Sequence, residues 1–420
     1  MSNPQSNQYE LLDLVKINYP KGVVDITNSY DNISITEDIF SPSIACTMDV
    51  LDSVDNLGVI DFDGTETFEL KFKGLKESDR EIYLTFRIFK VDINIDPQKS
   101  DIKLYRLHGV TPEHYTQATM DINQSFKMPI HKAVENVFGK LGSKRKLDVH
   151  ESSGTYTYIV PGMTPFETFD FLRRRAYDSK YRASLFVFYE DVDGYKFKNL
   201  ERIIFEERDN ALDFRYQPVA NIQTGDDDPN KNIEFLELSS NKDVLQKIKS
   251  GAYANAVKEV DLFNQRVNTS DVRIKEDFAT FTHLDKPSMS LDSKAIIDES
   301  LNVINSTQWI NKVQNEKDDK RAQLIPRRKF YFDCLSQVET KAVIPGNSNM
   351  SVGKVINLDI LELAGKTDNK QQEPKVSGKY LVTQVKHLLG KGSYRTNLIL
   401  NKESYNANVE DLSKNIVVNK

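Results

Sequence analysis

Hydrophobic and polar residues alternate along the first third of the chain. Apolar positions alternate with polar ones over Ile33–Phe40, and after a turn at Ser41–Ser43 the same period continues over Ile44–Val50. It recurs over Phe68–Phe72 and Ile82–Ile88. A period of two gives each strand one buried face. Several short strands separated by turn residues predict a β-sandwich or a β-barrel here.

The period becomes helical after about residue 125. Apolar residues recur every three or four positions over Ile130–Leu141, which predicts an amphipathic helix ended by Gly139 and Gly142. Thr164–Glu167 places threonine, proline and glutamate at the N-cap, first and third positions of a capping box. We therefore expect a second helix from about Pro165 to Tyr177.

Two strands follow these helices. The apolar run Leu185–Tyr189 predicts a buried strand, and Asp193-Gly194 predicts a turn. Tyr195 and Phe197 alternate with lysines in the expected return strand. Residues 125–205 therefore predict an α+β module.

The third region has a mixed pattern. Asp226–Asn230 predicts a solvated loop, and Ile233–Leu238 alternates like a strand. We expect a helix near Val244–Ala252, irregular polar sequence over 262–290, and a further helix over about 293–322. Trp309 lies within the predicted helix 293–322, where we interpret it as a packing anchor or an interface aromatic.

Strands are predicted again after Pro326. They cover the segments Phe330–Leu335, Val338–Val343, Ile356–Ile360, Tyr380–Lys386 and Tyr394–Leu400, with glycine-containing turns at 346–349 and 390–392. The tail after Ser404 is polar. Strand-rich segments at both ends thus flank a helix-containing middle, and no residue-level repeat links 20–105 with 326–405.

Length and charge narrow the class of protein. The chain has 420 residues, with 56 Lys and Arg against 62 Asp and Glu and a net charge of −6. This length suits two to four domains at roughly 100–200 residues each. The acidic balance argues against a protein whose main task is to neutralise phosphates. Met1–Glu10 is polar and no long apolar run occurs, so we expect no signal peptide and no membrane span.

The cysteines and histidines give little indication of chemistry. Cys46 and Cys334 are too few for a disulfide framework, which favours folding in a reducing cytoplasm and leaves one bridge between them as an open alternative. The six histidines have no metal-ligand spacing and no cysteine near them. We predict no metal site and no cofactor site.

Other candidate motifs are incomplete. Gly365-Lys366-Thr367 lacks the glycine five residues earlier that a phosphate-binding loop requires, and Asp226–Asp228 lacks the glycine of a calcium loop. The motifs of serine hydrolases, zinc proteases and dinucleotide-binding proteins are absent. The side chains of Arg173–Arg175 spread over about 200° of the helix circumference, which is typical of a solvated helix face. We therefore predict no catalytic residue and no enzyme, although paired carboxylates have no fixed spacing and stay an open alternative.

The order of these segments resembles the baseplate hub proteins of contractile-tailed bacteriophages. The resemblance is carried by Ile33–Pro42 with Asp49–Asp52 and Asp63–Glu66, by Ile159–Phe166 with Leu185–Glu190 and Gly194–Phe197, and by Ser377–Val382 with Val385–His387 and Tyr394–Leu400. These matches span about residues 20–405. The stretch from about 255 to 325 matches nothing in that family.

The resemblance implies a fold and a domain plan. The fold would be α+β and β-rich, with two similar tube-type β-barrels flanking a helix-containing middle. The implied plan has a first barrel over residues 1–122 and an α+β module over 123–212. A mixed segment over 213–325, which is partly an insertion, leads to a second barrel over 326–405 and a polar tail over 406–420.

The resemblance also implies a role in the virion. Three chains, each with two barrels, would form a pseudo-sixfold ring that joins a sixfold tail tube to a threefold central spike and leaves a channel for DNA. The implied partners are two further copies of the chain, the spike, the tube or tube-initiator protein, the tape measure protein and baseplate wedge proteins, with no membrane. The hub of a bacterial contractile injection system, another tail ring protein and a tail-associated cell-wall hydrolase stay as alternatives.

Overall fold

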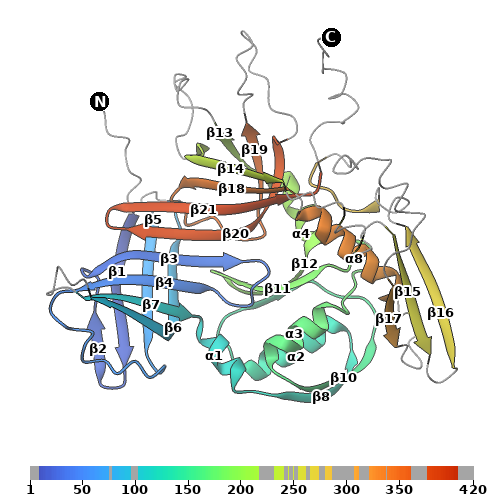
Figure 1. Ribbon diagram of the computed structural model, residues 1–420, viewed down its shortest axis with the longest axis horizontal. Helices are drawn as coiled ribbons and strands as arrows, with labels where there is room; N and C mark the ends of the chain where they lie inside the picture. The colour runs from blue at the N-terminus through green and yellow to red at the C-terminus, as the bar shows by residue number, and fades with distance from the viewer. Residues whose placement is uncertain are drawn as a thin grey trace, which may run out of the picture.

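The computed structural model describes residues 9–74, 78–95, 103–216, 231–240, 245, 249, 254–261, 265–273, 280–285, 307–311, 321–336, 338–360 and 376–404. Most of the described chain is β-structure, with five α-helices among the described residues. The prediction of a β-rich α+β fold is confirmed. Figure 1 shows a broad sheet with the helical module packed on one side of it.

A single 13-stranded sheet contains strands from both ends of the chain. The N-terminal strands are β1 Tyr9–Tyr19, β2 Gly22–Asp25, β3 Tyr30–Asp38, β4 Ala45–Asp52, β5 Thr67–Gly74, β6 Glu81–Ile95 and β7 Lys103–Val110. The others are β13 Leu212–Tyr216, β14 Phe235–Ser240, β18 Val338–Pro345, β19 Val355–Ile360, β20 Gly378–Gly390 and β21 Ser393–Lys402. The order is β14-β18-β21-β20-β3-β4-β7-β6-β5-β1-β2, and β19 connects β13 to β20.

The N-terminal strands enclose a core of the alternating residues that the sequence predicts to be buried. The rings of Phe68 and Phe86 stack there with their centroids 5.1 Å apart. Gly109 on β7 faces these rings, and a Cβ at that position would lie 2.6 Å from a ring carbon of Phe68. Glycine is therefore required where β7 crosses the aromatic pair.

The two halves of the sheet join where β3 pairs with β20. The antiparallel register runs from Gln384 opposite Asp38 to Gly390 opposite Asn32. Leu389 of β20 and Tyr394 of β21 belong to the N-terminal core, although they are C-terminal in sequence. Each half therefore completes its core with residues from both ends of the chain.

The middle module contains the two helices and two strands that the sequence predicts, together with further elements that it does not predict. In chain order they are α1 Pro112–Ala118, β8 Ile122–Met128, α2 Ile130–Leu141, β9 Leu147–Val149, β10 Tyr156–Met163, α3 Pro165–Arg173, β11 Phe186–Asp191, β12 Gly194–Asn199, α4 Leu200–Glu207 and a 3-10 turn at Arg208–Asn210. The predicted elements among them are α2, α3, β11 and β12. Gly142 ends α2 with φ of 70°, whereas Gly139 lies inside the helix. Both bonds of the capping box form between Thr164 and Glu167, and α3 ends four residues before the predicted Tyr177.

Two predictions for the third region and one for the segment after Pro326 are wrong. A strand, β16 Arg266–Arg273, lies within the segment predicted to be irregular, and β17 Thr307–Asn311 lies within the predicted helix 293–322. Both pair with β15 Ala254–Asp261, so the backbone of Trp309 lies opposite Lys258 in a three-stranded sheet. The segment predicted as strand Phe330–Leu335 belongs to a helix, α8 Arg321–Leu335.

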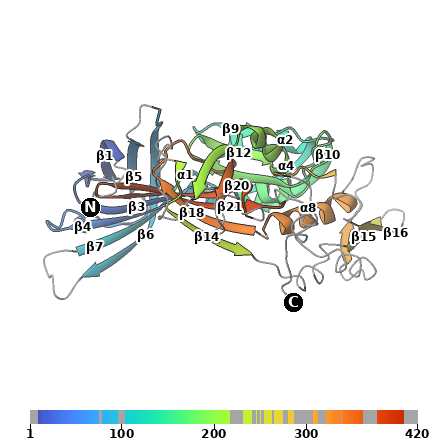
Figure 2. The same ribbon diagram turned by 90° about the horizontal axis from the view of Figure 1, so that it is seen from above.

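The reason for the error at α8 is its proline. Pro326 lies inside the helix, where proline usually ends one. The buried residues Phe330, Tyr331, Cys334 and Leu335 nevertheless recur at helical spacing against the C-terminal core. Figure 2 shows α8, β15 and β16 at one end of the molecule and the N-terminal strands at the other. The expected helix near 244–252, apart from residues 245 and 249, the loop 226–228, the motif 365–367 and the tail 406–420 lie outside the described residues.

Candidate functional site

The described residues contain no group of three or more His, Cys, Asp and Glu side chains arranged to hold a metal ion. Cys46 and Cys334 are both buried free thiols, so the alternative of a bridge between them is wrong. Burial raises the pKa of the Cys46 thiol above its usual range. No described helix is long and apolar enough to cross a membrane.

The histidines are distributed over the fold and each contacts a different group. Nε2 of His108 lies 3.0 Å from Asp92, and Nδ1 of His114 lies 3.0 Å from the Ser43 hydroxyl. His131 contacts Ser152, His150 accepts a hydrogen bond from the backbone N–H of Asn199, and His283 lies beside Glu403. His387 is fully buried, with the Tyr394 hydroxyl 2.9 Å from Nδ1 and Glu37 3.8 Å from Nε2. These contacts lie in different parts of the fold and do not converge on one site.

The arginine run on α3 is paired within the helix. Arg173 and Arg174 both form ion pairs with Asp170. The guanidinium of Arg175 lies over the ring of Phe171, 3.5 Å from its centroid. The run is therefore engaged along the helix, as i,i+3 and i,i+4 neighbours are.

A buried carboxylate attaches the middle module to the N-terminal strands. Glu190 of β11 accepts hydrogen bonds from the Ile44 N–H at 3.1 Å and the Thr111 hydroxyl at 2.6 Å. Nε of Arg145 lies 3.0 Å from its other oxygen. Burial raises the pKa of Glu190 to about 7, although the charge of Arg145 and the hydrogen bonds oppose the shift.

A second connection attaches the N-terminal strands to the C-terminal half. Arg80 donates from Nε to the Ser348 carbonyl and forms an ion pair with Asp193 at 2.9 Å. The side chain of Asn349 accepts from the Arg80 N–H and donates to the Ser78 carbonyl. Three segments distant in sequence are thus held together at one place.

The strands at the two ends of the sheet differ. β14 pairs with β18 on one side and with no described strand on the other. Phe235 and Leu238 on this strand expose 53% and 46% of their surface. At the other end, β2 pairs only with β1 among the described strands and carries the exposed Val23. Unpaired edges with apolar side chains are places where another chain can add a strand.

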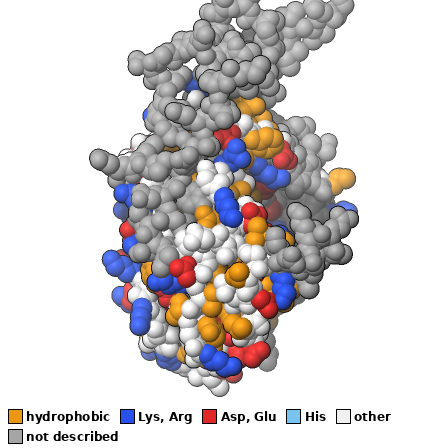
Figure 3. Space-filling model, turned by 90° about the vertical axis from the view of Figure 1, so that its left-hand side faces the viewer, with side chains coloured by type: hydrophobic (Ala, Val, Ile, Leu, Met, Phe, Trp, Pro, Cys, Tyr) orange, Lys and Arg blue, Asp and Glu red, His pale blue; other side chains and the backbone are white. Residues whose placement is uncertain are grey.

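The exposed face of the sheet carries both signs of charge. On β4 and β7, Asp49 and Arg106 pair at 2.7 Å, and on β6 Lys90 and Asp92 pair at 3.0 Å. Figure 3 shows the N-terminal end, where Lys, Arg, Asp and Glu side chains are interspersed with hydrophobic ones. The geometry therefore offers edges and mixed surfaces for assembly, and the described residues assemble no catalytic constellation.

Sequence reasoning found the strands of this surface but missed which strands are edges. The alternation of Ile233–Leu238 predicted the strand that became β14, shifted by two residues. Two exposed apolar residues on one polar strand were the available signal for an edge.

Comparison with known proteins supports the resemblance that the sequence shows. The chain is 23% identical over 314 residues to the probable baseplate hub protein gp334 of Vibrio phage KVP40, covering 69% of this chain and 71% of that protein. No family model matches. The resemblance to baseplate hub proteins is thereby confirmed, and the relative's name describes a structural part of a phage tail.

Two solved structures share the fold. The tail protein from Neisseria meningitidis MC58 superposes with a TM-score of 0.54 at 10% identity, covering 93% of this chain and 96% of that one. The 43 kDa tail protein of prophage MuSo2 from Shewanella oneidensis has a TM-score of 0.54 at 9% identity, covering 93% and 97%. At these identities the likeness establishes the fold of phage tail proteins.

Proposed function

We propose that the protein, which resembles baseplate hub proteins in sequence and phage tail proteins in fold, is the hub subunit of a contractile-tail baseplate. Three copies form a pseudo-sixfold ring that joins the sixfold tail tube to the threefold central spike. DNA passes through the ring without specific binding. The protein acts as a structural part of the virion and not as an enzyme.

The observation that carries this proposal is one continuous sheet in which the strands at the two ends of the main path, β14 and β2, present unlike edges, while a branch ends at β13. A ring requires contacts between different surfaces of neighbouring copies, repeated until the rotation closes. The β14 edge of one copy and the β1–β2 edge of the next are such surfaces. Because the strands come from both ends of the chain, each copy contributes two strand-rich halves to the ring. Three copies thus supply six similar units to a sixfold tube.

The exposed face of the sheet suits the wall of a channel. Nucleic acid is retained where unpaired cations neutralise its phosphates and release counterions. On this face, cations such as Arg106 already have a carboxylate partner. A wall of paired charges lets DNA pass without holding it.

The mass of the full-length chain in solution tests the proposal. We expect three copies, either for the chain alone or when its spike and tube partners are added. Electron microscopy of that complex should show a ring with six lobes around a central hole. A chain that stays monomeric with both partners present would exclude the hub function.

Matched variants test the edge contact separately. Phe235→Lys with Leu238→Lys places two charges on the open edge of β14, which blocks strand addition. We expect this double variant to lose the trimer and keep its circular dichroism spectrum. Ile159→Lys on β10, which is also exposed but lies outside the large sheet, should remain trimeric. A trimeric double variant would place the subunit contact elsewhere.

A further inference from the structure

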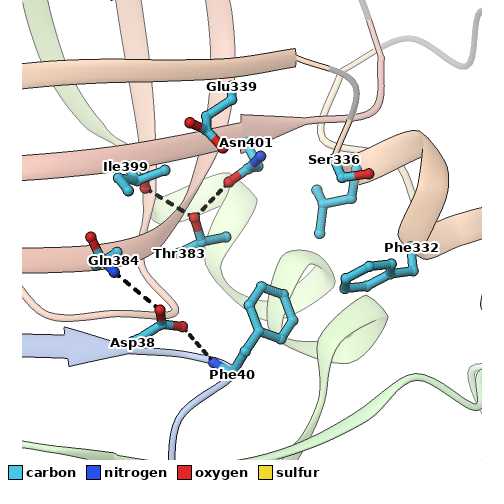
Figure 4. A pocket seen from close by; sticks show the side chains of 10 residues that line it. Asp38, Phe40, Phe332, Ser336, Glu339, Thr383, Gln384, Ile399 and Asn401 are labelled. Atoms are coloured by element: carbon cyan, nitrogen blue, oxygen red, sulfur yellow. Dashed lines mark hydrogen bonds between the residues drawn. The ribbon is translucent and has the colours of Figure 1, made fainter. Parts of the chain in front are cut away.

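A recess lies where α8 meets the exposed face of the sheet. Its volume is about 190 Å³, and its lining comes from the ends of β3, β18 and β21, the middle of β20, and α8. Figure 4 shows Phe40 and Phe332 at one side of the recess, with Asp38, Gln384, Thr383, Asn401 and Glu339 along the sheet. Residues distant in sequence, from the two halves of the sheet and α8, thus form one hollow.

The aromatic wall is unusually open to solvent. Phe40 exposes 46% of its surface and Phe332 exposes 41%. Their rings meet edge to face with centroids 5.5 Å apart. Two phenylalanines that contact each other edge to face and still face solvent present an aromatic surface to a ligand.

Two carboxylates line the sheet side of the recess, Asp38 of β3 beside Phe40 and Glu339 of β18, with β20 and β21 between these two strands. Asp38 is held in place because it accepts hydrogen bonds from the Phe40 N–H at 2.8 Å and from Nε2 of Gln384 at 3.1 Å. Glu339 projects from β18 into the same hollow. Within the described part of the chain, neither carboxylate has a cationic partner.

The floor of the recess has little capacity for further hydrogen bonding to an anion. The Thr383 hydroxyl donates to Oδ1 of Asn401 at 2.6 Å, and its oxygen lies 3.1 Å from the Ile399 carbonyl. Two negative charges and no cation in the lining disfavour an anionic ligand. A purely apolar ligand would desolvate both carboxylates without compensation.

We propose that this recess binds an arginine side chain presented by a partner protein. A guanidinium is planar, stacks on aromatic rings and donates up to five hydrogen bonds to carboxylates. Phe40 and Phe332 supply the aromatic surface and Glu339 supplies the acceptor, while Asp38, whose two oxygens already accept from the Phe40 N–H and from Gln384, adds a second negative charge to the recess. The arginine stem fills the apolar part of the hollow beside Leu335. This proposal goes beyond the hub function and does not depend on it.

Fluorine NMR on the full-length chain tests the proposal directly. Phe332 is replaced by 4-fluorophenylalanine, and the protein is titrated with N-acetyl-arginine methylamide as the probe. N-acetyl-citrulline methylamide, which has the same shape without the charge, is the matched probe. We expect a saturable shift of the fluorine resonance with the arginine probe at millimolar concentration, and a citrulline affinity lower by about fivefold or more.

Two variants separate charge recognition from general stickiness. Glu339→Gln alone, and together with Asp38→Asn, should weaken arginine binding, the double variant by about tenfold. A second labelled chain carries the fluorine at Phe89, which is exposed on β6 outside the recess, and should show no saturable shift. Equal shifts with citrulline, unchanged affinity in Glu339→Gln and the double variant, or no saturable shift at Phe332 would each overturn the proposal.

Discussion

Leu389→Ala tests whether the two ends of the chain fold as one unit. Leu389 lies on β20 and is 1% exposed, yet it packs in the core of the N-terminal strands. The variant removes three carbon atoms, and at about 0.8 kcal/mol per buried carbon the transfer term is about 2.4 kcal/mol. The cavity adds to this, so we expect a loss of about 3–5 kcal/mol in the free energy of unfolding.

The neighbouring residue provides the control. Leu388 is one position earlier on β20 and lines the exposed face of the sheet. Because side chains alternate along a strand, Leu388→Ala should cost less than about 1 kcal/mol. Urea unfolding followed by circular dichroism measures both variants. A larger loss for Leu388→Ala than for Leu389→Ala would mean that the register of β20 is shifted by one residue, and equal losses would contradict the burial of Leu389 in the N-terminal core.

Hydrogen exchange tests the coupling across the joint. Gln384–Gly390 of β20 pairs with Asn32–Asp38 of β3. We expect Leu389→Ala to speed amide exchange in peptides from both strands, because opening of one removes the hydrogen-bond partners of the other. If exchange rises in β20 alone, the two halves are separate folding units and the reasoning fails.

Three further predictions concern single positions. Thr164→Ala removes one bond of the capping box and should lower the free energy of unfolding by about 1 kcal/mol; an unchanged melting temperature would contradict it. Folding raises the pKa of Glu190 to about 7 from 4.5. The contribution of protonated Glu190 to the free energy of unfolding is therefore fully present below about pH 4.5 and is lost as the pH rises through 7. The melting temperature of Glu190→Gln, compared with that of the unmodified protein at the same pH, should therefore be more favourable at about pH 8 than at about pH 5. A difference in melting temperature that does not change with pH would refute this. Gly194→Ala should lower the melting temperature sharply, because φ is +139° and the new Cβ would lie 2.5 Å from the Lys146 carbonyl; a fully stable variant would show that β12 starts differently.

Local signals in the sequence predicted the local elements well. The capping box at Thr164–Glu167 specifies its helix start through two short-range hydrogen bonds, and both are present. The alternation over Phe68–Phe72 and Ile82–Ile88 predicted β5 and β6, since one buried face per strand is a property of the segment itself. These features depend on neighbours within a few residues.

Features set by distant contacts could not be predicted in this way. Alternation shows which face of a strand is buried but not which strand lies beside it, so the pairing of β3 with β20 left no local signal. Pro326 favoured a helix end, but the packing of Phe330 and Cys334 against the C-terminal core kept α8 helical past it. Tertiary packing overrides local preference at such sites. The recess beside Phe40 and Phe332 depends on the same helix and was therefore missed.

The pairing of charges changes how the net charge of −6 should be interpreted. Excess acid along a channel would repel phosphates, and the sequence alone suggests that explanation for passage of DNA. Several exposed charges on the sheet instead form pairs, such as Arg106 with Asp49 at 2.7 Å and Arg395 with Glu234 at 2.9 Å. Exposed pairs of this kind add little to stability, so their value lies elsewhere. A cation already engaged by a carboxylate releases fewer counterions to a passing phosphate, so in the proposed channel such pairs would retain DNA less than unpaired cations would.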